Sequence, residues 1–316
     1  KVNYCMEESI VKVEHLSHRY SVQWAIRDIN IEITRNGIYG LLGSNGAGKS
    51  TTMNIICGVL NQTEGEVFIN GINLRENPVE AKRYIGFLPQ QPPLYTDLTV
   101  EEYLRNAAHL RLMEKSEVNK AVDVALARCS ISHFRNRLIK NLSGGYQQRV
   151  GIAQAIVHNP KFVVLDEPTN GLDPNQIVDI RNLIREIAED HAVLLSTHIL
   201  SEVQAICNEI KMIENGKLVF SGSMEDFDNY VAPESFVIEF GKSPDKTVLE
   251  TLCENKGVEV LGNGRFRIFL KDDTAITERY VEASVANEWV LKDLLVERCS
   301  LDEIFAQLSG KTKNSK

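Results

Sequence analysis

The chain has 316 residues, of which 43% are hydrophobic, so it contains enough apolar material for one large domain or two smaller ones. Its formal net charge of -8 argues against a main partner that is a polyanion, such as DNA or an acidic lipid surface, because most of its field repels phosphate. Any phosphate binding is therefore expected at a local site.

The cysteines are scattered singly, without metal-ligand spacing, which predicts reduced and mostly buried side chains in a cytosolic protein. They are Cys5, Cys57, Cys129, Cys207, Cys253 and Cys299. No segment approaches the roughly 18 consecutive apolar residues that span a bilayer, and the N-terminus lacks the pattern of a signal peptide. We therefore expect a chain that is soluble on its own.

From Ile10 to about Phe220, short β-branched runs alternate with helical patterns, as in strands joined by crossover helices in a largely parallel sheet. The predicted strands are residues 10–13, 29–34, 38–42, 65–69, 85–88, 162–165, 192–196 and 210–213. Between Thr99 and Arg128, apolar residues recur at helical spacing, which predicts a helical insertion.

After Asn229 the pattern restarts, and Val231-Ala232-Pro233 is the expected linker because proline favours an extended chain. The predicted elements that follow are strand 235–240, helix 247–255, strand 258–261, strand 265–270, helix 274–286, strand 289–297 and helix 301–308. The β-α-β-β-α-β order is that of the ferredoxin-like motif, which hosts many unrelated functions. Residues 310–316 are polar and are expected to be disordered.

The strongest local motif is the run Gly43-Ser44-Asn45-Gly46-Ala47-Gly48-Lys49-Ser50-Thr51, which lies between an apolar strand and a helix. Its glycines let backbone N–H groups converge on a β-phosphate, and the following helix directs its positive end to the same point. Lys49 can reach the β and γ oxygens, and Ser50 can ligate Mg²⁺. The run predicts a nucleoside triphosphate site.

A second motif is the apolar strand 162–165, which ends in two carboxylates, Asp166 and Glu167. Asp166 can hold magnesium through water, and Glu167 can polarise the attacking water as a general base. These two motifs also suit P-loop kinases and GTPases, so they do not define the class by themselves.

The run Leu142-Ser143-Gly144-Gly145-Tyr146-Gln147-Gln148-Arg149 separates these classes. This run contains Ser143 and two glycines and is followed by a segment with apolar residues at helical spacing. It predicts a helix that Ser143 caps and whose first backbone N–H groups are free to donate. The run closely resembles the signature of ABC ATPases. The resemblance implies that Ser143, Gly144 and Gly145 contact the γ-phosphate of a nucleotide bound to the opposite protomer.

Further landmarks of that family follow in order between Ile10 and Phe220. Tyr20 resembles the aromatic residue that stacks on adenine. Gln90 resembles the glutamine that senses the γ-phosphate and the metal, with its neighbour Gln91 as the alternative.

Two later segments complete the pattern. The run Gly171-Leu172-Asp173-Pro174 resembles the loop that couples the two sites, which implies that Asp173 acts at the partner's nucleotide. His198 resembles the switch histidine, whose implied role is to hydrogen-bond the γ-phosphate and keep Glu167 and the attacking water in line.

The resemblance implies an α/β fold, with a P-loop ABC ATPase core over residues 1–230. This core would comprise a RecA-like lobe, an antiparallel β lobe and a helical subdomain at about 91–158, followed by a small α+β ferredoxin-like domain at 231–309. The implied ligands are ATP and Mg²⁺. The residues implied to hold the metal are Ser50, Gln90 and Asp166.

The implied partners are a transmembrane permease and, when ATP is bound, a second ATPase subunit that is either the same chain or a related one. No nucleic acid partner is expected. The expected location is the cytoplasm, at the inner face of the cell membrane through the permease. Residues 91–99, with two prolines and an exposed aromatic, are predicted to dock this permease, the alternative being an ordinary surface loop.

The segment from Ser300 to Gly310 resembles the ending of drug and antibiotic exporter ATPases that have separate six-helix permeases. It implies export of a drug, antibiotic, peptide or lipid-like cargo, although the same segment also fits an ordinary amphipathic helix. The alternative is a soluble ABC ATPase that acts on nucleic acid or the ribosome. The single phosphate loop and the lack of a sustained heptad pattern between Gln90 and the signature disfavour that alternative.

Overall fold

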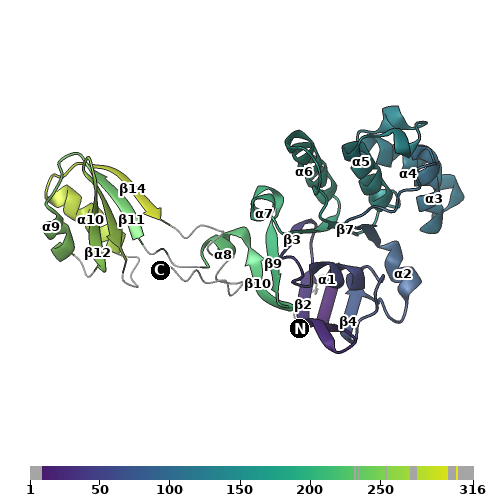
Figure 1. Cartoon of the computed structure of the whole chain (residues 1–316), viewed down its shortest axis with the longest axis horizontal. Coiled ribbons are helices and arrows are strands. Elements are labelled where there is room, and N and C mark those ends of the chain that lie inside the picture. The colour runs from purple at the N-terminus through teal and green to yellow at the C-terminus, as the bar shows by residue number, and fades with distance from the viewer. Residues whose placement is uncertain are drawn as a thin grey trace, which may run out of the picture. The chain divides into compact units, whose positions relative to one another are not determined.

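The structure is a computed structural model that describes residues 9–230, 233, 235–252, 255–270, 276–297 and 304. The chain divides into two compact units, and it passes from the first to the second between Met224 and Glu225. Figure 1 labels the helices and strands of both units. Among the described helices, none combines the length and the apolar character that crossing a membrane requires.

A six-stranded sheet forms the centre of the first unit (Figure 1). Its strands lie in the order β10 (Lys217–Ser223), β9 (Glu209–Glu214), β3 (Gly37–Leu42), β8 (Ala192–Thr197), β7 (Phe162–Asp166) and β6 (Ile85–Leu88). Neighbouring strands run parallel, except that β9 and β10 are antiparallel. Every residue of β7 and β8 is buried, as expected for parallel strands that are covered on both faces.

Helices connect and cover these strands. They are α1 (Lys49–Ile56) after β3, α5 (Gly144–Ile156) before β7, α6 (Pro174–Ala188) after β7 and α7 (Leu200–Ile206) after β8. In α6, Ile180, Leu183, Ile184 and Ile187 recur at helical spacing and are all buried. Because the strands are parallel, their carboxyl ends meet at one edge of the sheet, which is where open α/β sheets bind ligands.

A separate antiparallel sheet contains β2 (Gln23–Ile33), β1 (Val11–Tyr20), β4 (Glu64–Ile69) and β5 (Ile72–Asn73), in that order. The segments predicted as strands 10–13 and 29–34 belong to this sheet, and both strands are longer than expected. Register shifts between Val13 and Arg19 interrupt the alternation of apolar and polar residues that marks a strand, which explains the short prediction.

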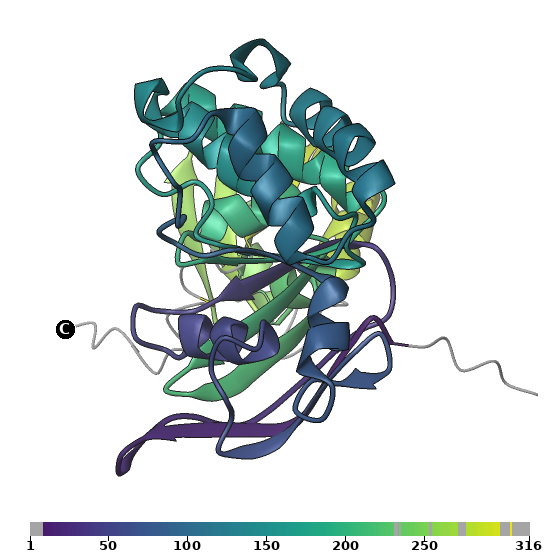
Figure 2. The ribbon, with the colours of Figure 1, turned by 90° about the vertical axis from the view of Figure 1, so that its right-hand side faces the viewer.

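The helical part of the first unit follows β6. It comprises α3 (Val100–Leu110), α4 (Lys115–Arg128), the short 3-10 helices η1 (Ser132–Phe134) and η2 (Ile139–Asn141), and α5; α2 (Pro78–Arg83) precedes β6. Thr99 and Glu102 form a reciprocal capping box at the start of α3. The predicted helical insertion is thus two helices. These helices and the antiparallel sheet lie toward opposite ends of the first unit (Figures 1 and 2).

The second unit has the predicted β-α-β-β-α-β order and its own core. Its elements are α8 (Met224–Asp228), β11 (Ser235–Phe240), α9 (Lys246–Leu252), β12 (Gly257–Gly262), β13 (Arg265–Phe269), α10 (Ile276–Ala286) and β14 (Leu291–Glu297). The antiparallel strand order is β12-β13-β11-β14. Phe236, Phe240 and Tyr280 are fully buried within this core, and the Tyr280 hydroxyl donates to the Leu249 carbonyl oxygen at 2.6 Å, which ties α10 to α9.

Several predictions fall outside the described residues. They are the linker residues Val231 and Ala232, most of helix 301–308 and the tail 310–316. Within that predicted helix, Ile304 is described as helical and is fully buried.

Candidate active site

The phosphate loop joins β3 to α1 at the carboxyl edge of the six-stranded sheet. Gly46 and Gly48 have φ angles of +82° and +113°, a region that favours glycine. A Cβ atom at Gly48 would lie 2.6 Å from Ile26 Cγ2, so the loop also approaches β2 too closely for a side chain there. The backbone is therefore shaped to bring successive N–H groups to one point at the start of α1.

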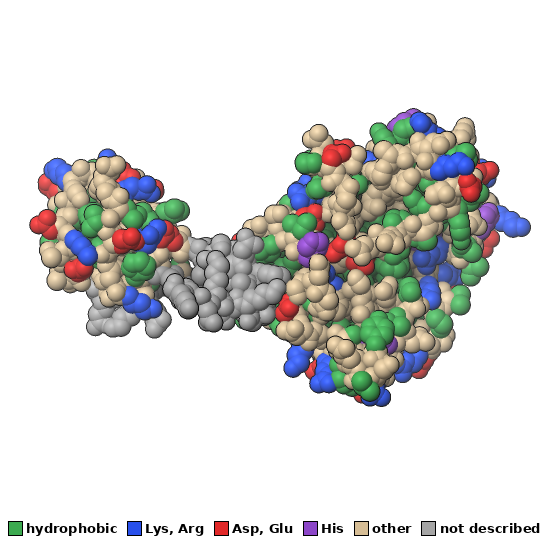
Figure 3. Space-filling model, viewed as in Figure 1, with side chains coloured by type: hydrophobic (Ala, Val, Ile, Leu, Met, Phe, Trp, Pro, Cys, Tyr) green, Lys and Arg blue, Asp and Glu red, His purple; other side chains and the backbone are tan. Residues whose placement is uncertain are grey.

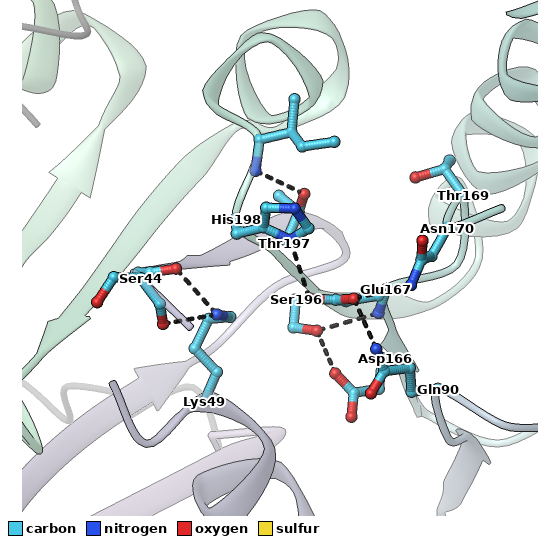
Figure 4. A network of polar contacts seen from close by, with 12 residues as sticks. Ser44, Lys49, Gln90, Asp166, Glu167, Thr169, Asn170, Ser196, Thr197 and His198 are labelled. Carbon is cyan, nitrogen blue, oxygen red and sulfur yellow. Dashed lines mark hydrogen bonds and ion pairs between the residues drawn. The ribbon is translucent and has the colours of Figure 1, made fainter. Parts of the chain in front are cut away.

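Lys49 is the first residue of α1 and is 6% exposed. Its Nζ donates to the carbonyl oxygens of Gly43 at 2.9 Å and Ser44 at 3.1 Å (Figure 4). Burial lowers the pKa of Lys49, while the negative charges of Glu167 and Asp166 act in the opposite direction. The site thus holds a largely desolvated ammonium group next to the loop, where a phosphate can pair with it.

A carboxylate that the sequence analysis missed also holds this loop. Glu214, at the end of β9, is 7% exposed. The Ser44 hydroxyl donates to its Oε1 at 2.7 Å, and the Ser44 N–H donates to its Oε2 at 3.2 Å. Since these residues are 170 positions apart in the chain, no local pattern could have revealed the pair.

The two acids of the second motif lie at the end of β7, as predicted. Asp166 is 5% exposed and accepts a hydrogen bond from the Ser196 hydroxyl of β8. The Glu167 N–H donates to that same Ser196 oxygen at 3.0 Å. Glu167 has a φ of +47°, which is uncommon for a residue other than glycine and turns the chain sharply away from the strand.

Three side chains hold the Glu167 carboxylate (Figure 4). Gln90 Nε2 donates to Oε2 at 2.8 Å, and Asn170 Nδ2 donates to the same oxygen at 3.2 Å. His198 Nδ1 lies 3.0 Å from Oε1 and supplies the third hydrogen bond. The structure therefore brings Gln90, Glu167 and His198 together from three loops, and it adds Asn170, which the sequence analysis did not single out.

A cavity of about 850 Å³ opens between the phosphate loop and these side chains. The residues that line it include Lys49, Ser50, Gln90, Glu167 and His198. Its lining also includes Tyr20, Gln23, Trp24, Asn45, Gly46, Gly48, Thr51 and Asn170. The cavity can hold a nucleotide whose phosphates face Lys49.

Two aromatic side chains are available to a base in this cavity. Tyr20, the predicted stacking residue, is 54% exposed at the end of β1. Trp24, near the start of β2, was not singled out from the sequence, and the Arg27 guanidinium lies 4.9 Å from its ring centroid. The exposed ring of Tyr20 offers stacking surface to a base, whereas Trp24 is partly buried.

The four residues assigned to a partner's nucleotide lie elsewhere. Ser143 is the N-cap residue of α5, followed by Gly144 and Gly145, and Asp173 caps α6 by accepting from the N–H groups of Asn175 and Gln176 at 3.0 Å each. None of Ser143, Gly144, Gly145 and Asp173 lines the 850 Å³ cavity. A single chain thus does not bring them to its own phosphate loop cavity.

A phosphate loop between β3 and α1, with two carboxylates at the end of a parallel strand of the same sheet, defines a P-loop protein that binds a nucleoside triphosphate. The family model of ABC transporters matches residues 26–170. The bacitracin transport ATP-binding protein BcrA of Bacillus licheniformis is 32% identical over 310 residues, which cover 96% of this chain and 98% of that protein. The chain therefore belongs to the ATP-binding subunits of ABC transporters, and it is an ATPase.

Two further likenesses support the same family. The lipopolysaccharide export system ATP-binding protein LptB of Haemophilus influenzae is 34% identical over 225 residues, which cover 70% of this chain and 93% of that protein. The solved dimeric structure of MJ0796, a bacterial ABC transporter cassette, superimposes with a TM-score of 0.61 at 28% identity, over 68% of this chain and 98% of that one. The fold is that of a P-loop ABC ATPase followed by a small α+β unit.

Proposed function

We propose that the chain hydrolyses ATP in the 850 Å³ cavity and thereby powers a separate transmembrane permease that exports a drug, antibiotic, peptide or lipid-like cargo. The observation that carries this proposal is the match to BcrA, because it spans 96% of this chain and so includes the second unit. The chain would then act at the cytoplasmic face of the membrane, bound to the permease.

The side chains around Glu167 suit the hydrolysis of a phosphoanhydride. The Glu167 carboxylate removes a proton from a water molecule as the water oxygen bonds to the γ-phosphorus and the bond to the ADP oxygen breaks. Gln90 and Asn170 orient the carboxylate, while His198 donates to Glu167 and lines the same cavity, where it would hydrogen-bond the γ-phosphate. Lys49 stabilises the charge on the β and γ oxygens.

The oxygen donors near the loop fit Mg²⁺. Ser50 and Gln90 line the cavity, and Asp166 adjoins Glu167 at the end of β7, so a hydroxyl, an amide and a carboxylate are the proposed ligands. The described residues contain no cluster of three or more His, Cys, Asp or Glu side chains that could hold a metal. This suits an ion that completes its coordination with phosphate oxygens and water. When bound, the ion would neutralise charge on the transferred phosphoryl group.

A second groove supports the proposed permease partner. It has a volume of about 650 Å³ and lies along α3, with Val79, Leu110 and Leu112 as apolar lining and Lys82 and Arg111 as basic lining. From the segment 91–99, Pro93 and the 59% exposed Tyr95 line it. Exposed aromatic and apolar side chains of this kind are typical of the buried centre of an interface.

This surface is tested by crosslinking. A cysteine introduced by Tyr95→Cys should crosslink to the membrane protein encoded beside this chain, when the two are expressed together. Val22→Cys, on the β1–β2 turn at 91% exposure, is the matched control, and crosslinks from the unmodified chain are subtracted. Equal crosslinking from both positions, or none from Tyr95→Cys in a complex that hydrolyses ATP, contradicts docking at this groove.

The cargo is tested in living cells. A bacitracin-sensitive bacterium that expresses the chain with its permease should tolerate more bacitracin, and the same pair carrying Glu167→Gln should not. Unchanged tolerance together with normal ATP hydrolysis would exclude bacitracin-like cargo. The face shown in Figure 3 gives no support to the alternative of a soluble ATPase acting on nucleic acid, since basic and acidic side chains are interspersed on it.

A further inference from the structure

A buried carboxylate lies behind the proposed catalytic side chains. Glu202, in the first turn of α7, is 5% exposed and does not line the 850 Å³ cavity. The Thr197 hydroxyl donates to Glu202 Oε2 at 2.7 Å, and the Thr169 hydroxyl donates to Oε1. Burying a carboxylate is costly unless its oxygens find partners, and here each oxygen accepts a hydroxyl hydrogen bond.

The two threonines lie beside the proposed catalytic groups: Thr169 is in the loop after β7, and Thr197 is the last residue of β8 (Figure 4). Thr197 directly precedes His198, and Thr169 lies two residues after Glu167 and directly before Asn170. Besides the hydrogen bond from the Glu167 N–H to Ser196, these segments meet at two more points. On the cavity side His198 bonds directly to Glu167, and on the buried side Glu202 joins the residues that flank them.

A cation from a third element faces the same carboxylate. Arg181 of α6 places a guanidinium nitrogen 3.9 Å from Glu202 Oε1. Because α6 begins directly after Asp173, the loop 167–173 is held at its far end by a helix whose arginine faces the same acid. Glu202 is thus in contact with the ends of both loops and with α6.

On the cavity side, the His198 side chain is 41% exposed, and its Nδ1 contacts Glu167 Oε1 at 3.0 Å. Glu167 adopts a left-handed backbone conformation that surrounding contacts must stabilise. A hydrogen bond of 3.0 Å between such residues depends on the separation of their two segments, which both the Ser196 contact of Glu167 and the two contacts of Glu202 hold.

We propose that Glu202 is a positioning residue of the ATPase, which ties the Thr169 loop to the Thr197 loop and so keeps His198 within hydrogen-bond distance of Glu167. This inference rests on the roles proposed above for Glu167 and His198. Since Glu202 does not line the nucleotide cavity, it acts on turnover and not on nucleotide binding.

The test is a double-mutant cycle on the full chain, with steady-state ATP hydrolysis as the measurement. Glu202→Ala should lower kcat by about tenfold and change KM by less than about twofold, because residues within one hydrogen-bond network couple strongly. In a His198→Ala background the same substitution should lower the residual kcat by less than about twofold, since its effect passes through His198. An effect of equal size in both backgrounds, or an unchanged kcat in Glu202→Ala, overturns the proposal.

Two further comparisons separate positioning from folding. Glu101→Ala removes a partly buried carboxylate, which pairs with Arg105 and Arg135 away from the cavity, and should leave kcat unchanged. Thr169→Val deletes one hydroxyl at constant shape and should lower kcat, whereas Thr169→Ser should restore it. If Glu202→Ala does not fold, this pair decides, and equal rates for Thr169→Val and Thr169→Ser overturn the proposal.

Two single variants, Glu167→Gln and His198→Ala, test the catalytic roles on which this inference rests. If Glu167→Gln and His198→Ala both keep wild-type turnover, the proposed catalytic roles are wrong and this inference falls with them. If those two variants lose turnover and Glu202→Ala does not, only the positioning role is wrong.

Discussion

Glu167 has a backbone φ of +47° at the end of β7, and its carboxylate accepts hydrogen bonds from Gln90, Asn170 and His198. The conformation costs of the order of 1–3 kcal/mol, which the surrounding contacts have to offset. The sharp turn places the carboxylate in the cavity, while the preceding Asp166 stays against β8. Two adjacent acids thereby face different surroundings.

This arrangement predicts the behaviour of Glu167→Gln. The amide matches the carboxylate in shape but cannot accept a proton, so ATP binding should persist while hydrolysis falls by on the order of 10²-fold or more. Binding of a fluorescent ATP analogue and release of phosphate, measured on the same preparation, check both parts. Near wild-type hydrolysis would assign the base to another group.

The motif residues could be predicted because each motif is a contiguous run next to an apolar strand. Lys49 ends the loop that follows β3, and Asp166 and Glu167 lie at the end of β7. The structure places all three at one edge of the sheet, as that pattern implies. Glu214 and Glu202 could not be predicted, because their partners are distant in the chain or on other elements, and an isolated glutamate is ordinarily a solvated side chain.

At the scale of elements, the end of α5 meets the start of β6 through a histidine. His158 Nε2 donates to the Ile85 carbonyl oxygen at 3.0 Å, while its Nδ1 is buried and has no hydrogen-bond partner among the described residues. Burial lowers the pKa of His158 from its ordinary 6.5 to about 4. The neutral ring is therefore the form that fits this contact.

This pKa shift predicts a loss of stability in acid. The His158 ring takes up a proton near pH 6.5 in the unfolded chain but only near pH 4 in the folded chain. The free energy of unfolding should therefore fall by about 2 kcal/mol between pH 7.5 and pH 5 through this group. Urea unfolding at both pH values checks it. His158→Gln should show a smaller loss between the two pH values than the wild type, and an identical loss in both proteins contradicts the assignment.

Most elements could be predicted, and β10 is an exception with a physical cause. The strands of the parallel sheet are continuous apolar runs, so β3, β6, β7, β8 and β9 match their predictions to within one residue at each end. β10 was missed because only intermediate or exposed residues compose it. It lies at the edge of the sheet and pairs antiparallel with β9 alone, so no apolar pattern was required there.

At the scale of the whole molecule, the positions of the proposed phosphate-binding groups fit a second subunit. Ser143, Gly144 and Gly145 present a helix N-terminus, a favourable place for an anion, yet they do not line the cavity of their own chain. A head-to-tail pair of chains would bring each such helix to the nucleotide of its partner, and symmetry would create two sites.

ATP should therefore convert Glu167→Gln protein from monomer to dimer, since this variant is expected to hold ATP without cleaving it. Adding Ser143→Arg should prevent the change, because a long side chain would occupy the place of the γ-phosphate. Analytical ultracentrifugation with and without MgATP measures the shift. Equal dimerisation of the single and double variants would show that the signature loop does not contact a partner's nucleotide.

The separate core of the second unit has a calorimetric consequence. Phe236, Phe240 and Tyr280 pack within that unit, whereas the nucleotide cavity is lined only by residues of the first. Heating should then give two endotherms, one for each unit. Because a ligand stabilises the folded unit that binds it, MgATP should raise the midpoint of the endotherm of the first unit and leave that of the second unchanged. The unshifted endotherm would serve as an internal reference for every variant of the cavity, because it reports whether a preparation is folded independently of its affinity for nucleotide.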